Sequence, residues 1–194
     1  MSDFRKITPA RRESVPVYKT HNEYKPLLRE DFHQRCGYCG DHEFFRDTYY
    51  EVDHFVPQKC LVNISPTEYS NLVYSCRSCN NSKRAKWPTG DENVHNDGEQ
   101  GFIDPCDDAY AAQFERLADG SIHSITDLGD WMWSALNFGN PAHRVRWKLE
   151  EIKIMLKELD EVNIDSLEEL KTRDELNRLY RKLEEQFRGK PNFA

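Results

Sequence analysis

The stretch CRSCNNSK, residues 76–83, contains a Cys-x-x-Cys pair that is followed at once by two asparagines, a serine and a lysine. A second pair, CGYC at residues 36–39, precedes it in the chain. Thiols stay reduced in a chain without an export signal, and each such pair can present two sulfurs to one ion. We therefore predict one structural zinc site, against the competing interpretation of two disulfides or redox pairs. The predicted zinc ligands are Cys36, Cys39, Cys76 and Cys79.

Zinc in such a site is expected to be structural, because four thiolates leave no open position for water. It would staple a small motif that has little core of its own, so its binding free energy would largely be folding free energy. The two remaining cysteines, Cys60 and Cys106, are expected to be ordinary thiols.

Composition and charge limit the class of protein. The 194 residues are 38% hydrophobic, enough for one sizeable core or a compact domain with an appended element. No apolar run reaches the length of a membrane span, and the first residues lack the apolar core of a secretory signal, so we expect a cytoplasmic protein without a membrane partner.

The net charge of −7 is unevenly distributed along the chain. Residues 1–90 hold 14 Lys and Arg against 11 Asp and Glu, a net +3, and residues 91–194 hold 13 against 23, a net −10. The first part can lie beside phosphates, whereas the second is better suited to structure or to a protein partner.

Between the two cysteine pairs lies YYEVDHFVPQ, residues 49–58, an apolar and aromatic run interrupted by Asp53 and His54. Taken alone, this run is typical of an edge strand whose charged residues face water. A zinc ion that clamps both ends of the segment would, however, bring residue 53 close to residue 80, which directly follows the last cysteine. Asp53 and Asn80 would then offer two oxygen ligands to a second metal ion.

The flanking segments carry local signals of their own. Apolar positions between Tyr24 and Arg35 predict a short helix before the first cysteine pair. Residues 44–57 predict a strand or strand pair, and the Asp119-Gly120 turn predicts a hairpin. Asn140-Pro141 begins a long helix, and a capping box at Ser166 begins another, so the C-terminal part is predicted to be a helical hairpin.

The central segment resembles the HNH, or ββα-metal, endonucleases, and its four cysteines resemble the phage resolvases of the endonuclease VII kind. The resemblance covers roughly residues 30–87. It rests on nine positions in order: Cys36, Cys39, Asp53, His54, Asn71, Cys76, Cys79, Asn80 and Lys83. It implies an α+β fold in which a zinc-stapled ββα-metal core is followed by the C-terminal helical hairpin. The sequence departs from the family pattern in having Asn instead of His at position 80, a known option in the family that keeps the metal-ligand role.

The resemblance also implies roles for individual residues. His54 would be the general base that takes a proton from water, as an imidazole can near neutral pH. Asp53 and Asn80 would hold a catalytic Mg²⁺ or Mn²⁺, which stabilises charge on the phosphate and on the leaving 3′ oxygen. Asn71 would bridge backbone groups and fix the imidazole. A satisfied core histidine, a helix cap and a turn asparagine are the respective structural alternatives.

Basic residues after Asn80 are expected to meet the backbone of a DNA substrate, although a solvated basic helix is nearly as good an interpretation. They are Lys83, Arg84 and Lys86. Glu51, on the same strand face as Asp53, is a candidate to support the metal ligands, against an edge carboxylate.

These expectations give four regions: an N-terminal arm at 1–22, an HNH nuclease domain with structural zinc at 23–90, a connecting segment with a hairpin at 91–139 and a helical region at 140–194. The predicted function is a metal-dependent DNA endonuclease. The alternative is a zinc-stabilised nucleic-acid-binding or scaffold module without nuclease activity. A weaker resemblance to HNH nucleases of bacterial antiphage defence suggests an effector whose acidic helical part binds a partner such as an ATPase subunit.

Overall fold

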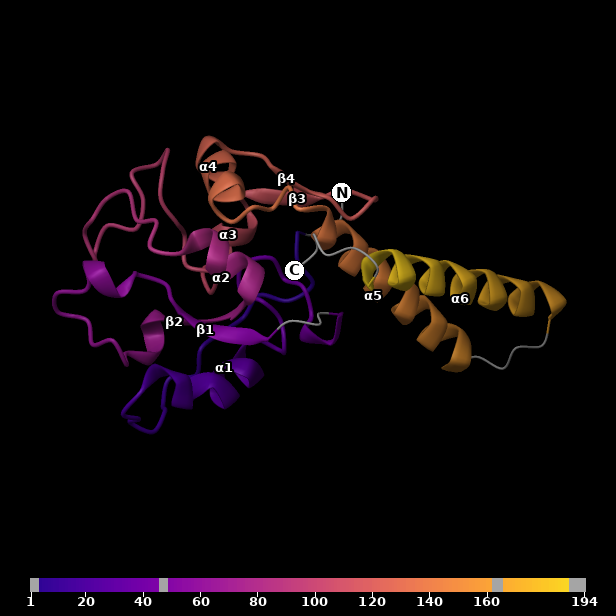
Figure 1. Cartoon of the computed structure of the whole chain (residues 1–194), viewed down its shortest axis with the longest axis horizontal. Helices are drawn as coiled ribbons and strands as arrows, with labels where there is room; N and C mark the ends of the chain where they lie inside the picture. Colours follow the sequence, from indigo (N-terminus) through magenta and orange to yellow (C-terminus); the bar gives the residue numbers. More distant parts are fainter. Residues whose placement is uncertain (1–3, 46–48, 162–165, 189–194) are drawn as a thin grey trace.

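The computed structural model describes residues 4–45, 49–161 and 166–188. A globular part and a pair of long helices make up this structure, and the helices α5 and α6 project from one side of the globular part (Figure 1). The mixture of helices with two small sheets confirms the predicted α+β class.

The centre of the globular part is a two-stranded antiparallel sheet with a helix attached. Strand β1 (Tyr50–His54) pairs with β2 (Leu72–Cys76), so that Asp53 lies opposite Val73 and His54 opposite Leu72. Every residue of β2 is buried, and helix α2 (Arg77–Lys83) follows it without a loop. Helix α2 ends at Arg84, whose φ of 49° lies in the left-handed region. This short helix therefore stays close to the two strands.

Short helices complete this central unit. The 3₁₀ turn η1 (His21–Tyr24) leads into α1 (Lys25–Asp31), which contacts both strands. Three further 3₁₀ turns are η2 (Glu43–Phe45), η3 (Gln58–Cys60) and η4 (Tyr69–Asn71). The predicted strand at 44–57 therefore begins only at Tyr50, because η2 occupies its first residues.

A second layer contains α3 (Asp108–Ala111), the hairpin of β3 (Phe114–Arg116) and β4 (Ile122–Ser124), and α4 (Asp127–Ala135). Its turn places Gly120 at a φ of +85°, where glycine avoids the strain of a side chain. The N-terminal segment, predicted as an arm, packs into this layer: Phe4 is 3% exposed, and its ring centroid lies 4.9 Å from that of Phe114. Both layers thus share one core.

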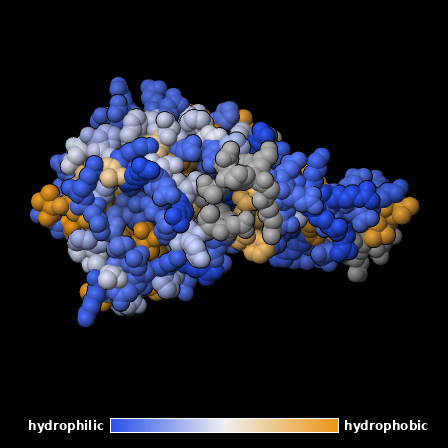
Figure 2. All heavy atoms as spheres, viewed as in Figure 1, coloured by the Kyte–Doolittle hydropathy of each residue, from blue (hydrophilic) through white to orange (hydrophobic). Residues whose placement is uncertain are grey.

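Helices α5 (Pro141–Glu161) and α6 (Leu167–Arg188) pack against each other as the predicted helical hairpin. The side chain of Asn140 accepts a hydrogen bond from Ala142 N at 2.9 Å, and Ser166 and Glu169 form the predicted capping box. Hydrophilic side chains dominate the visible face of both parts, with apolar residues in separate small patches (Figure 2). None of the helices in the described part of the chain has the length and apolar composition that crossing a bilayer requires.

Arg116 connects the two layers from a fully buried position. Its guanidinium donates hydrogen bonds to the carbonyl oxygens of Phe4 at 3.1 Å, Gly120 at 3.1 Å and Cys39 at 2.9 Å. A buried guanidinium with three carbonyl acceptors holds the N-terminal segment, the hairpin and the first cysteine pair in one arrangement.

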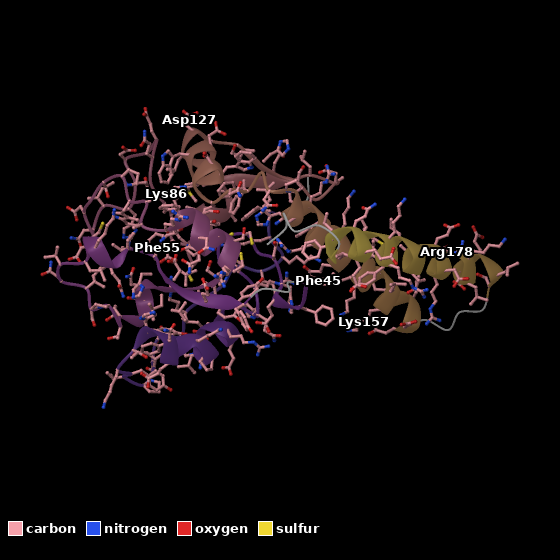
Figure 3. The ribbon with its side chains drawn as sticks, in the orientation of Figure 1. Phe45, Phe55, Lys86, Asp127, Lys157 and Arg178 are labelled. Carbon is pink, nitrogen blue, oxygen red and sulfur yellow. The ribbon has the colours of Figure 1, made fainter. Side chains whose placement is uncertain are left out.

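We expect Arg116→Met to lower the free energy of unfolding by about 3 kcal/mol or more, because it leaves three interior carbonyls without their donor. Urea denaturation followed by circular dichroism measures this change. Arg178→Met is the matched control, since Arg178 is exposed on α6, far from the core (Figure 3), and should change stability by less than about 0.5 kcal/mol. Equal losses in the two variants would contradict the connecting role of Arg116.

Candidate functional site

The four predicted zinc ligands converge in the core. Their sulfurs all lie within 4.8 Å of one another, and each residue is at most 1% exposed. The first pair forms a turn after α1, and the second lies at the junction of β2 and α2, where Cys76 Sγ accepts a hydrogen bond from Cys79 N at 3.4 Å. Burial raises the pKa of the Cys39 and Cys79 thiols well above the ordinary value, so thiolates here need a cation to stabilise them. This cluster could bind zinc in the tetrahedral arrangement that four thiolates favour.

Close packing fixes the first cysteine pair against the sheet. Gly37 N donates to the carbonyl oxygen of Tyr74 at 2.8 Å. A Cβ atom at position 37 would lie 2.6 Å from a ring carbon of Phe32 and 2.8 Å from a methyl carbon of Val73. A side chain at this position is therefore excluded by its neighbours.

His54 lies at the end of β1 and is 9% exposed. Its Nε2 atom is 2.7 Å from the carbonyl oxygen of Pro66 and 3.3 Å from the Gln58 amide. The Gln58 atom is the amide nitrogen, a donor, but the shorter contact is to a carbonyl oxygen, which only accepts hydrogen bonds. Nε2 therefore carries a proton and, in the neutral ring, Nδ1 holds the lone pair. Among the described residues no hydrogen bond engages Nδ1. The ring is thus oriented as a base.

His21 packs against this imidazole and was not predicted from the sequence. The two ring centroids are 4.6 Å apart, with an angle of 63° between the ring planes. Burial and the neighbouring His54 lower the pKa of His21, which favours its neutral form. Turn η1 carries His21, and the side chain of Glu23 accepts a hydrogen bond from Thr20 N at 2.8 Å at the start of this turn.

Asp53 points to the other side of β1, toward α2. Its Oδ2 atom accepts a hydrogen bond of 2.6 Å from the Tyr38 hydroxyl and lies 3.0 Å from Lys83 Nζ, which also donates to His54 O at 2.8 Å. Burial raises the pKa of Asp53, and Lys83 opposes this effect. No contact with a described residue occupies the second carboxylate oxygen.

Asn80 faces the same side of the sheet, one helical turn before Lys83. Its Nδ2 atom donates to Glu51 Oε2 at 2.8 Å, which leaves the amide oxygen as the atom available to a cation. Asn80 is thus hydrogen-bonded to Glu51, and Asp53 forms an ion pair with Lys83. Within the described residues, no hydrogen bond connects Asp53 directly to Asn80. Two carboxylates and an amide oxygen on one side of the sheet are the donor set that Mg²⁺ or Mn²⁺ prefers.

Asn71 holds the chain just beyond His54. Its side chain accepts a hydrogen bond from Val56 N at 2.8 Å and donates one to Val56 O at 3.1 Å, while its backbone oxygen accepts from Phe55 N at 2.8 Å. These bonds extend the pairing of β1 with the chain before β2. They fix the backbone that carries the imidazole without touching the ring.

The three basic residues differ in position. Lys83 is fully buried and paired with Asp53, which corrects the prediction that it meets a nucleic-acid backbone: a buried ammonium is held by its counter-charge and cannot reach a surface phosphate. Lys86 donates to the carbonyl oxygen of Ala135 at 3.0 Å, linking the chain just after α2 to the end of α4. Arg84 is exposed, with its Nε donating to Asn81 O at 3.0 Å.

Residues 36–86 match the family model described as HNH endonuclease, about a quarter of the chain. This segment contains both cysteine pairs, the two strands and α2. Searches of curated proteins and of solved structures gave no match. Residues 36–86 are therefore similar to an HNH endonuclease domain, which supports a nuclease of the HNH type.

Removal of zinc is expected to unfold this domain, since metal binding to such sites contributes about 10–16 kcal/mol in zinc-finger peptides at neutral pH. Cys79→Ser should lower the zinc content and abolish near-ultraviolet circular dichroism from the buried tyrosines. Cys60→Ser is the matched control, because Cys60 lies outside the cluster. Full zinc content in Cys79→Ser, measured by atomic absorption, would exclude Cys79 as a ligand.

Proposed function

We propose that this protein is a metal-dependent endonuclease that hydrolyses phosphodiester bonds of DNA, with His54 as the general base. The observation that carries this proposal is the 2.7 Å contact between His54 Nε2 and the carbonyl oxygen of Pro66. It selects the tautomer whose Nδ1 can take a proton from water. An imidazole fixed in this way at the end of a strand is suited to activate a water molecule for attack on phosphorus.

Asp53 and Asn80 are the residues proposed to hold the divalent ion. When bound, Mg²⁺ or Mn²⁺ would act as a Lewis acid on the phosphate and its leaving 3′ oxygen. Glu51 holds the Asn80 amide by its NH₂ group and so turns the oxygen outward. Asn71 keeps the backbone of residues 55 and 56 in place and thereby keeps His54 at the strand end. Arg84, exposed after α2, is the basic residue placed to meet a phosphate.

The ion pair between Lys83 and Asp53 limits the charge of this site. Glu51 and Asp53 bring two negative charges and Lys83 returns one positive charge, so a divalent ion would meet a net charge of only −1 from these side chains. Such a site is expected to bind Mg²⁺ weakly on its own and better together with the phosphate of a substrate.

The same ion pair favours a second candidate function. A carboxylate already neutralised by a buried lysine can be a structural element of a zinc-stabilised nucleic-acid-binding or scaffold module. Antiphage defence, an ATPase partner for α5 and α6 and a cytoplasmic location stay predictions, since nothing in the described residues tests them.

His54→Ala is expected to lower the rate of plasmid cleavage by about 10²- to 10⁴-fold, the usual contribution of a general base. Supercoiled plasmid is incubated with purified protein and Mg²⁺ or Mn²⁺, or with EDTA, and nicked and linear products are quantified. His123→Ala is the matched control, because His123 is exposed on β4. Both variants should keep their zinc. Cleavage by His54→Ala at the wild-type rate would remove His54 from the mechanism, and a metal-replete wild type that binds DNA without cutting it would favour the second candidate.

Glu51 offers a test of the divalent-ion site. Glu51→Ala should raise the Mg²⁺ concentration for half-maximal cleavage by about 10-fold or more, since the support of the Asn80 amide is lost. Glu51→Gln keeps an oxygen that can accept from Asn80 Nδ2, so it should behave more like the wild type. If the Mg²⁺ requirement is unchanged in both variants, Asn80 is not oriented by Glu51 for metal binding.

A further inference from the structure

The first turn of α5 lies against the cysteine cluster, outside the segment that matches the HNH family. His143 is 1% exposed there, and its Nδ1 lies 2.9 Å from Asp41 Oδ2. A carboxylate accepts hydrogen bonds, so this nitrogen donates. Asp41 Oδ2 also lies 3.4 Å from Arg146 Nη1, one turn further along α5. Two residues of α5 are therefore bound to the carboxylate that follows the first cysteine pair.

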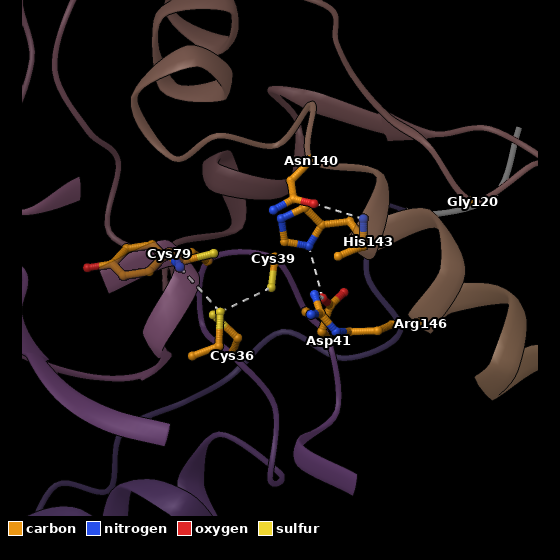
Figure 4. A network of polar contacts seen from close by, with 12 residues as sticks. Cys36, Cys39, Asp41, Cys79, Gly120, Asn140, His143 and Arg146 are labelled. Atoms are coloured by element: carbon orange, nitrogen blue, oxygen red, sulfur yellow. Dashed lines mark hydrogen bonds and ion pairs between the residues drawn. The ribbon is translucent and has the colours of Figure 1, made fainter. Parts of the chain in front are cut away.

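The same imidazole adjoins Cys39. The Cys39 sulfur, an Asp41 oxygen and a His143 ring nitrogen all lie within 4.8 Å of one another, and all three residues are buried. Figure 4 shows the His143 ring above the Cys39 sulfur, with Asp41 beside it. The second ring nitrogen, Nε2, is buried and has no hydrogen-bond partner in the described part of the chain. A buried ring nitrogen without a partner is costly in a folded protein, so the burial of Nε2 in this imidazole next to the cysteine cluster needs a physical reason.

Zinc chemistry supplies that reason. Four thiolates outweigh the charge of one Zn²⁺, so the sulfurs of the loaded site keep negative charge and are stabilised by N–H donors around them. Cys76 Sγ already accepts from Cys79 N, and the Ser75 hydroxyl lies 3.9 Å from Cys36 Sγ. His143 takes the corresponding position beside Cys39.

We propose that His143, held by Asp41, is a positioning residue of the zinc site: as a doubly protonated ring whose Nδ1–H goes to Asp41, it donates its Nε2–H to the Cys39 thiolate and so makes α5 part of the metal centre. Zinc binding and the docking of α5 are then coupled, and each strengthens the other by the same factor. Other contacts tie the same turn to the later chain, since Arg116 and Tyr110 donate to the carbonyl oxygens of Cys39 and Tyr38. The inference concerns the zinc site alone and does not depend on nuclease activity.

A second metal ion on Cys39, Asp41 and His143 is the competing use of this cluster. The Arg146 guanidinium at 3.4 Å and the His143 N–H at 2.9 Å already occupy Asp41 Oδ2, and Cys39 is committed to the four-sulfur group. A further cation would have to displace a buried guanidinium. A hydrogen bond from His143 to the Cys39 thiolate needs no such displacement.

The test is the zinc affinity of the full-length protein, measured by competition with a chromophoric chelator. His143→Phe keeps the ring volume and the edge-to-face packing against Phe138 but has no N–H, so the dissociation constant for zinc should rise by about 10- to 100-fold. Ile152→Ala is the control: it removes buried packing from the same helix without touching the cysteines, and its zinc affinity should stay within about 3-fold of the wild type. Asp41→Asn is the second variant if His143→Phe does not fold, and it should weaken zinc binding in the same direction.

Replacing zinc by cobalt distinguishes a hydrogen bond from His143 to Cys39 from direct coordination of the metal by His143. Wild type and His143→Phe should bind one Co²⁺ each, with the same absorption of a four-thiolate tetrahedral site. An unchanged zinc affinity in His143→Phe would overturn the proposal. So would a cobalt spectrum that differs between wild type and variant, or two zinc ions in the wild type and one in the variant, because either result would make His143 a direct ligand.

Discussion

The convergence of four cysteine sulfurs within 4.8 Å is the constraint on which the rest of the site depends. A two-stranded sheet such as β1 and β2 is marginal by itself, since it has few cross-strand pairs and one short helix to cover it. A zinc ion on these sulfurs would close the loop between positions 36 and 79, which contains all of β1. Because β2 and α2 meet at Cys76, the same closure sets the angle of α2 to the sheet. The side chains of α2 then face the carboxylates of β1.

The burial of charge is the second constraint. Asp53 lies in the interior, where an ionised carboxylate needs a partner, and Lys83 provides the opposite charge one helical turn after Asn80. Lys83 also donates to His54 O. Lys83 thus contacts both the Asp53 carboxylate and the backbone of His54, so these two residues of β1 are fixed relative to α2. Stability and the geometry of the site depend on the same contacts.

The sequence predicts local features well and distant contacts poorly. The cluster of Cys36, Cys39, Cys76 and Cys79 follows from their spacing, and the helical hairpin follows from apolar periodicity and its caps, since both signals lie within a few residues. The burial of Lys83 cannot be predicted from the sequence, because the local sequence of a short helix is the same whether its lysine faces water or a buried carboxylate. His21 and His143 lie outside the motif, and only the folded chain brings them to it. The core position of Phe4 is hidden for the same reason.

The small size of the HNH segment explains why the flanks are so closely attached to it. About fifty residues bury too little apolar surface to be very stable on their own. Here one core cluster runs from Phe4 through the cysteines to Phe138, and the guanidinium of Arg116 reaches the first cysteine pair from the second layer. A displacement of the β3–β4 hairpin can therefore shift the turn at Cys36–Cys39 through the side chain of Arg116. The flanking segments act as the outer part of the domain's core, and the first turns of α5 are fixed to it through Asp41, while α6 extends away from the globular part.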